Sequence, residues 1–202
     1  MLPIIGAEHH VHLEATIRPE TFSELADKHG IEIPDGLTSE DGQRFLYNDL
    51  PDFMRVYDIV TSVIKDPEDF YRVAYEYLLK NADDNVMVSE LIYSPHHMHM
   101  AAGMSHQDCI DVLSRAIDDA RTATSSRDIG GIEGRLICTI VRHEENSIAY
   151  GEEIASFIAD TKPNYVTGFG LAGIELEDDV FDYAKAFAIA KQAGLGLSPH
   201  AG

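Results

Sequence analysis

The stretch Ile4-Ile5-Gly6-Ala7-Glu8-His9-His10-Val11-His12 is a short apolar run that ends in histidines. We expect residues 4–12 to form a β-strand. Residues two apart in a strand point to the same side, so His10 and His12 should face together and His9 should face the opposite way. Two neutral imidazoles that converge on one point suit Zn²⁺ or a similar borderline metal. Such a pair by itself does not establish a metal site, because histidine has many other roles.

Four further short apolar runs follow this stretch, and they alternate with longer segments of helical spacing. The expected strands are 85–93, 134–141, 165–170 and 195–198, and the expected helices are 19–29, 52–64, 68–79, 107–122, 152–159 and 180–193. Gly30 is the expected C-terminal cap of the first helix. Strands that alternate with helices indicate parallel pairing through right-handed crossovers.

Two architectures fit this order, a Rossmann sheet and a β/α barrel. The glycine-rich dinucleotide fingerprint after a strand is missing, which disfavours the Rossmann sheet. A barrel normally needs eight strands and about 250 residues. The 202 residues here supply five expected strands, too few to close one.

A second expected strand also ends in histidine, at Ser198-Pro199-His200. Strands one and five lie on opposite walls of an eight-stranded barrel, and the C-terminal rim of the barrel is where chemistry takes place. His200 is therefore a candidate third ligand for a metal between His10 and His12.

The composition excludes several classes of partner. Lys and Arg total 15 against 35 Asp and Glu, which gives a formal net charge of -20. An acidic surface repels phosphate backbones and anionic lipids, so we expect no nucleic acid or membrane partner. The two cysteines are far apart in the sequence and form no paired motif, which suits a reducing compartment. The N-terminal residues do not resemble a signal peptide. No segment has the roughly 20 consecutive apolar residues that are needed to span a bilayer. We therefore expect a cytoplasmic protein.

Five blocks in this order resemble the adenosine deaminase family. They are residues 10–14 with 17–21, residues 93–95, Arg142-His143, residues 168–173 and residues 200–202. The resemblance implies a TIM-type (β/α)8 barrel of the metal-dependent hydrolase kind, with only about the first five strands present. Residues 1–202 would be a single domain, the N-terminal part of that barrel, with a helical insertion at about 40–82 after the first strand.

The resemblance also implies an activity, the hydrolytic deamination of adenosine to inosine. One Zn²⁺ per chain would be held by His10, His12 and His200, and would lower the pKa of the water that attacks C6 of the purine. Gly173 matches the glycine whose backbone N–H meets the purine ring. Glu14 stands where many members have an aspartate that holds a ribose hydroxyl. Adenine or another 6-aminopurine is the alternative substrate.

One helical stripe is a candidate for substrate binding. Leu50, Phe53, Met54 and Tyr57 have the i, i+3, i+4, i+7 spacing of an ordinary core-facing helix. The family places a gating helix over the purine pocket in this stretch, so we expect part of the stripe to pack and part to close over substrate and exclude water.

Three other features are less easily assigned. His96, His97 and His99, with two methionines, resemble a soft-metal tract. The family has no ligands there, so we expect surface histidines in a loop. Arg142-His143 is either a rim contact or a structural pair. Many family members have aspartate where Gly170 stands and an acidic residue where Ile174 stands.

The remaining catalytic groups of the family are expected after Gly202. They are a glutamate acting as general acid, a histidine that orients the water, and two aspartates. We therefore expect the 202-residue chain by itself to be inactive. An open five-stranded sheet has exposed edges that favour self-association. The alternative to a deaminase is a non-catalytic partial barrel that binds purine or metal.

Overall fold

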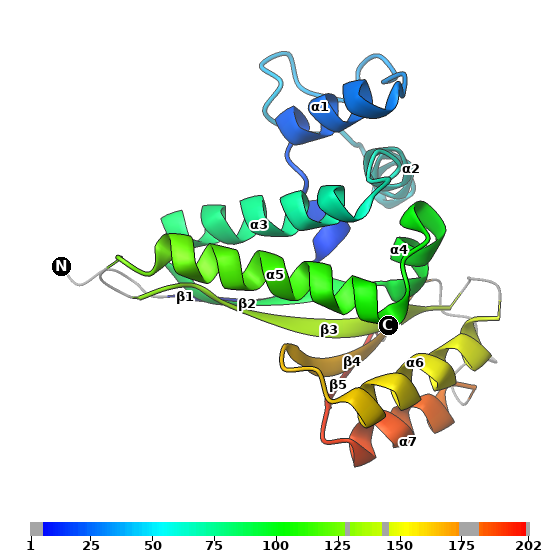
Figure 1. The fold of residues 1–202 in the computed structure, drawn as a ribbon. Helices are drawn as coiled ribbons and strands as arrows, with labels where there is room; N and C mark the ends of the chain where they lie inside the picture. The colour runs from blue at the N-terminus through cyan, green and yellow to red at the C-terminus, as the bar shows by residue number, and fades with distance from the viewer. Residues whose placement is uncertain (1–5, 128–129, 143–145, 174–181, 201–202) are drawn as a thin grey trace.

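The computed structural model describes residues 6–127, 130–142, 146–173 and 182–200, and contains one parallel sheet (Figure 1). Its strands are β1 (Gly6–His12), β2 (Val86–Tyr93), β3 (Glu133–Val141), β4 (Val166–Ala172) and β5 (Gly196–Pro199). Each strand pairs in parallel with the next along the chain, in the order β1-β2-β3-β4-β5. The predicted fold, the first five strands of a β/α barrel, is confirmed as a half-barrel.

The connections between the strands are helical. The elements are η1 (Leu13–Thr16), α1 (Pro19–His29), α2 (Leu50–Thr61), α3 (Pro67–Asp83), α4 (Pro95–Ala102), α5 (His106–Thr124), α6 (Ser147–Thr161) and α7 (Ala184–Gln192). A helix lies in each of the six predicted stretches, and α1 has the predicted bounds; residues 180 and 181 of the last predicted helix lie outside the described residues. Gly30 caps α1 in the left-handed conformation, with its N–H bonded to the carbonyls of Ala26 and Asp27.

The helices cover the sheet from outside. Helices α3 and α5 lie side by side over β1 to β3, while α6 and α7 pack on each other, with α6 against β3 and α7 against β5 (Figure 1). Fully buried side chains such as Leu91, Ile117 and Phe169 fill the layer between strands and helices. Gly134 permits the close approach of α5, because a Cβ there would lie 2.6 Å from Cγ1 of Ile117.

The histidine-rich segment after β2 was predicted to be a loop, and this prediction is wrong because residues 95–102 form helix α4. Ser94 caps its N-terminus by accepting a hydrogen bond from the His97 N–H, Pro95 occupies the first turn, and Gly103 ends it in the left-handed conformation. Met98 on this helix is fully buried. His96 and His97 are half-buried and only His99 is exposed, so the predicted surface position is wrong for the first two.

Strand β1 departs from regular geometry at its histidines. Glu8 pairs with Ser89 and Val11 pairs with Leu91, so three steps along β1 match two along β2. The extra residue makes a β-bulge, and His10 has φ +61°, in the left-handed region. The regular alternation expected for residues 9–12 therefore does not apply.

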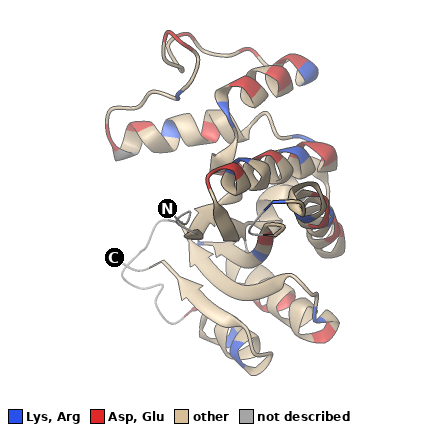
Figure 2. Ribbon diagram, turned by 90° about the vertical axis from the view of Figure 1, so that its left-hand side faces the viewer, with Lys and Arg blue, Asp and Glu red and all other residues tan. Residues whose placement is uncertain are grey.

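Asp, Glu, Lys and Arg positions are concentrated on the helices and the loops beside them (Figure 2). The strands carry fewer charges (Figure 2). Among the helices of the described ranges, none is long and apolar enough to cross a bilayer.

Candidate metal centre

Three histidines from the two ends of the sheet converge on one point. The Nε2 atom of His200 lies 2.8 Å from Nε2 of His10 and 3.1 Å from Nε2 of His12. The His12 and His200 rings are stacked with centroids 5.1 Å apart. His10 and His12 are at the C-terminal end of β1, and His200 directly follows β5. The structure thus brings together the three residues that the sequence singled out.

The bulge in β1 turns His10, together with His12, toward His200. The left-handed backbone of His10 lets its ring and that of His12 approach the same atom. His9 takes a different partner, because its Nδ1 lies 2.7 Å from Oε2 of Glu90 on β2. His9 was excluded as a ligand from the sequence, and the structure places it in this contact outside the cluster.

The protonation state of the cluster suits a metal. Nδ1 of His200 lies 2.8 Å from the Leu171 carbonyl oxygen, which can only accept, so Nδ1 carries the hydrogen and leaves the Nε2 lone pair free. Burial, together with the neighbouring His200 and His10, lowers the pKa of His12 to about 4. His12 is therefore a neutral imidazole at physiological pH.

The distances in the cluster also fit a bound cation. Four ligands around Zn²⁺ with Zn–N of about 2.0–2.1 Å would separate neighbouring nitrogens by about 3.3 Å. The 2.8 and 3.1 Å separations are close to this value. A shared cation would satisfy lone pairs that otherwise face one another. The donor set of three imidazoles suits zinc or a related borderline metal.

A second group of possible ligands, His29, Asp66 and Asp69, has a different explanation. The Lys28 ammonium lies 2.7 Å from a carboxylate oxygen of Asp66 and 2.7 Å from one of Asp69. Asp69 also accepts from the His29 ring at 2.7 Å. Lys28 neutralises one of the two carboxylate charges, and Asp66 and Asp69 both already have protein partners, so this group is explained as a network of ion pairs and hydrogen bonds that joins α1 to α3.

Glu14 lies beside the histidine cluster in sequence, in the turn η1, and is 3% exposed. The Ser94 N–H points toward its Oε1 at 3.5 Å. Burial raises the pKa of Glu14. The nearby His97 and the backbone hydrogen bonds lower it, but their effect is smaller, so the pKa is raised overall. Glu14 in turn acts on Tyr57 of α2, whose pKa is raised by burial and by the Glu14 charge. A buried carboxyl group therefore lies beneath the predicted gating helix.

The substrate stripe predicted on α2 is not the core-facing side of that helix. Val56 and Val60 form the buried side, at 3% and 4% exposure. Phe53 and Tyr57 are half-buried, with ring centroids 6.3 Å apart, and Met54 is 45% exposed. The side chain of Leu50 lies outside the described residues. The stripe thus forms a partly open apolar surface next to η1.

Gly173 and Arg142 occupy the same rim as the histidines. Gly173 follows β4 with φ +91°, a conformation that favours glycine. Its carbonyl oxygen accepts from Nη1 of Arg142 at 3.0 Å, and Nη2 of Arg142 donates to the His200 carbonyl at 2.9 Å. Sequence reasoning left Arg142 undecided, although its place directly after β3 indicates the rim. His143 and Ile174 lie outside the described residues.

Gly170 was noted because many family members have aspartate there. A Cβ at this position would lie 2.6 Å from Oγ1 of Thr139 and 3.1 Å from the Ser198 carbonyl oxygen. The neighbouring strands therefore require glycine at this point of β4.

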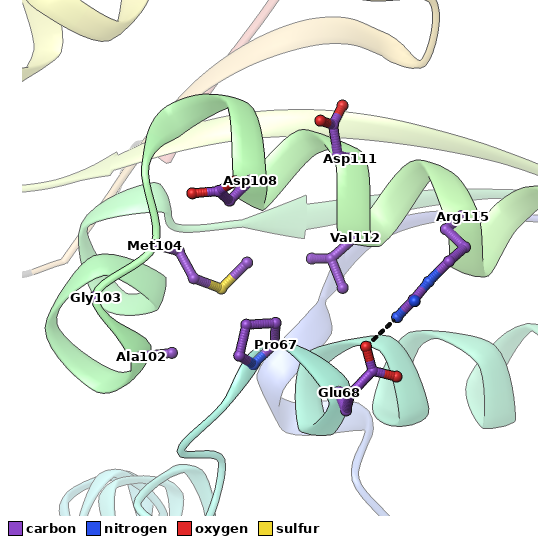
Figure 3. Close-up of a pocket in the computed structure, with 9 residues that line it drawn as sticks. All are labelled: Pro67, Glu68, Ala102, Gly103, Met104, Asp108, Asp111, Val112 and Arg115. Carbon is purple, nitrogen blue, oxygen red and sulfur yellow. Dashed lines mark hydrogen bonds and ion pairs between the residues drawn. The ribbon is translucent and has the colours of Figure 1, made fainter.

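A cavity of about 350 Å³ lies away from these residues, between the start of α3, the end of α4 and the first half of α5 (Figure 3). Pro67, Met104 and Val112 are among its apolar lining residues, and Arg115 bonds to Glu68 at its rim (Figure 3). It is on the outer, helical side of the sheet and does not belong to the histidine cluster.

Comparisons with known proteins identify the family of this chain. The family model "Adenosine deaminase" matches residues 6–202. An adenine deaminase of Mesorhizobium japonicum is 36% identical over 198 residues, 98% of this chain and 57% of that relative. The chain thus spans less than two thirds of the length of such relatives.

Solved structures show the same fold. The crystal structure of an adenine deaminase from Arthrobacter aurescens matches with a TM-score of 0.76 and 25% identity, covering 98% of this chain and 57% of that one. A zinc-bound amidohydrolase from Burkholderia ambifaria matches in fold, with a TM-score of 0.77, 24% identity and coverage of 99% and 52%. Together with the family model, these likenesses show that the chain belongs to the adenosine deaminase family.

Proposed function

We propose that this chain takes part in the hydrolytic deamination of a 6-aminopurine, with adenine as the preferred substrate. The observation that carries this proposal is the likeness to adenine deaminases, at 36% identity over 98% of the chain. Adenosine, the substrate expected from the family resemblance, is the second candidate, since the matching family model has that name.

Glu14 supports adenine over adenosine. Its carboxyl group is buried under α2 next to the Ser94 N–H, whereas a ribose diol needs a charged acceptor open to the pocket. Burial holds the Glu14 carboxyl group at a fixed place under α2, where its oxygen atoms can form hydrogen bonds with a base. Such a group matches the nitrogen-lined edge of a purine base.

We assign metal-binding and substrate-binding roles to residues of this chain. His10, His12 and His200 would hold a divalent cation, with zinc the proposed ion. When bound, such a cation acts as a Lewis acid and lowers the pKa of water. Gly173 would offer its backbone N–H to the purine. Leu50, Phe53, Met54 and Tyr57 on α2 would cover the base and exclude water.

The test compares adenine with adenosine on the zinc-loaded protein, by calorimetry for binding and by ultraviolet absorbance for turnover. We expect adenine to bind at least about tenfold more tightly, which corresponds to about 1.4 kcal/mol. Glu14→Asp should narrow this ratio, because the shorter side chain retracts the carboxyl group. Tighter binding of adenosine, or a ratio that Glu14→Asp leaves unchanged, would contradict the assignment.

Three finer expectations belong with this proposal. The absence of turnover from the 202 residues alone stays a prediction, which the same assay checks. Self-association through the sheet edges also stays a prediction, and light scattering checks it. A cytoplasmic location is proposed on the two unpaired, buried cysteines, which suit a reducing compartment.

A further inference from the structure

Arg142 joins the ends of three strands at the rim. It directly follows β3, and its guanidinium donates one hydrogen bond to the carbonyl of Gly173 after β4, at 3.0 Å. A second goes to the carbonyl of His200 after β5, at 2.9 Å. The planar fork of arginine holds two acceptors in a fixed relation, which a lysine ammonium cannot do.

The backbone of Arg142 is itself held in place. Its N–H donates to the Ala172 carbonyl at 2.9 Å. Its carbonyl oxygen accepts from the hydroxyls of Ser147, at 3.0 Å, and Tyr183, at 3.3 Å. These two hydroxyls are buried and lie 2.8 Å apart, so α6 and α7 are tied to the same point. These hydrogen bonds fix the main chain of Arg142, from which the guanidinium group extends.

His200 has few other restraints. It follows a strand of four residues, β5, whose only strand partner in the described part of the chain is β4. Its N–H and its ring Nδ1 both contact the Leu171 carbonyl, each at 2.8 Å. The Arg142 fork holds the other side of the same residue, at its carbonyl oxygen. Without the Arg142 hydrogen bond, the Leu171 carbonyl would be the only main-chain group among the described residues that orients the His200 ring.

We propose that Arg142 is a positioning residue, which holds the His200 imidazole against His10 and His12 and fixes the Gly173 peptide relative to them. This inference rests on the proposed metal site. It assigns to Arg142 a role that the sequence left open between rim contact and structural pair.

The charge of Arg142 and its hydrogen bonds predict opposite changes in metal affinity when the residue is replaced. Arg142 is a cation near a proposed cation site, so removing its charge should by Coulomb's law strengthen metal binding. Removing the hydrogen bonds that orient a ligand should weaken it, typically about 10–100-fold. The sign of the change therefore separates a positioning role from a simple electrostatic one.

The experiment measures Zn²⁺ affinity by competition with a chelating dye, and the visible spectrum of the Co²⁺-loaded protein. Arg142→Met should bind Zn²⁺ about 10–100-fold more weakly and change the Co²⁺ bands. Arg142→Lys keeps the charge, and with it the electrostatic effect, but loses the fork, so it should also bind Zn²⁺ more weakly. The matched control is Arg135→Met, which lies on β3 and makes the same charge change; the partners of Arg135 are Glu133 and the Gly134 carbonyl. It should stay within about twofold of the unaltered protein.

Two negative results have separate meanings. Zinc binding in Arg142→Met as tight as in the unaltered protein, or tighter, would overturn the positioning role alone. No binding by the unaltered protein, or no loss in His200→Ala, would refute the metal site and this inference with it. Thermal melting verifies that each variant is folded. If Arg142→Met does not fold, Arg142→Lys decides, since unchanged affinity there would overturn the inference.

Discussion

Replacing Gly170 by alanine tests how closely β4 is held between its neighbours. The new Cβ would lie 2.6 Å from Oγ1 of Thr139 on β3, a distance that real Cβ atoms essentially never show. It would also lie 3.1 Å from the Ser198 carbonyl oxygen on β5. Thr139 is 3% exposed, and its β-branched side chain has few rotamers to retreat into. Either β3 or β5 must therefore move.

The expected cost follows from two opposing terms. Overpacking of this kind costs about 1–3 kcal/mol. Alanine recovers about 0.4–1 kcal/mol, because it restricts the unfolded chain more than glycine does. We therefore expect Gly170→Ala to lower the free energy of unfolding by about 1–2 kcal/mol.

Urea denaturation followed by circular dichroism measures this change. Gly196→Ala is the matched control on β5, because its Cβ would meet the Thr167 carbonyl oxygen at an ordinary 3.5 Å. It should leave stability unchanged or raise it slightly. The double variant Gly170→Ala/Thr139→Ala should be more stable than the sum of the single changes predicts. Strict additivity, or a Gly170→Ala protein as stable as the original, would refute the steric explanation.

Three further predictions concern the rest of the fold. Burial raises the pKa of Asp69, but hydrogen bonds from Lys28 and other donors outweigh this effect and hold the pKa below its ordinary value. The ionised Asp69 therefore stabilises the fold at neutral pH, and this contribution is lost as the pH falls through the lower pKa of the folded state. Asp69→Asn should cost about 1–3 kcal/mol at pH 7 and reduce this acid dependence, as urea midpoints against pH would show. Phe169→Ala should cost about 3–5 kcal/mol in the same assay, because the fully buried ring packs on a second aromatic ring at 5.4 Å. Cys109 and Cys138 are buried, and burial raises the pKa of Cys109 to about 12, so a thiol reagent should label neither in the folded protein and both in denaturant.

Local sequence patterns predicted most of the helices and strands, for reasons visible at their ends. Pro19 and Gly30 bound α1, because proline suits the first turn and glycine the left-handed cap. Equivalent cues, Ser94 and Gly103, were present around α4. The His/Met composition between them favoured the wrong prediction of a surface loop. Composition was the poorer guide there, since capping residues report directly on backbone hydrogen bonds.

The bulge at His10 could not be predicted, because no residue in 4–12 requires it. A histidine with φ +61° is locally unfavourable, and only pairing with β2 explains the extra residue. Sequence reasoning placed His10 and His12 together by assuming a regular strand. The pairing of these two rings is observed, but it depends on an irregularity that the assumption excluded.

The contrast between His200 and Arg142 shows what sequence reasoning about this rim can reach. In a parallel sheet the C-terminal ends of all strands meet at one edge, so residues that follow the strands are predicted to lie together. This topology predicted the place of His200 at the rim, whereas Arg142 was left open between a rim contact and a structural pair. Their roles depend on atoms that no pattern encodes: Nδ1 of His200 is turned to the Leu171 carbonyl, and the Arg142 fork reaches two peptide oxygens. A carbonyl at the second nitrogen suits a histidine to the proposed role of metal ligand, whereas the two main-chain carbonyls suit the arginine to the proposed positioning role. Hydrogen-bond partners, more than residue types, therefore separate candidate ligand from support at this rim.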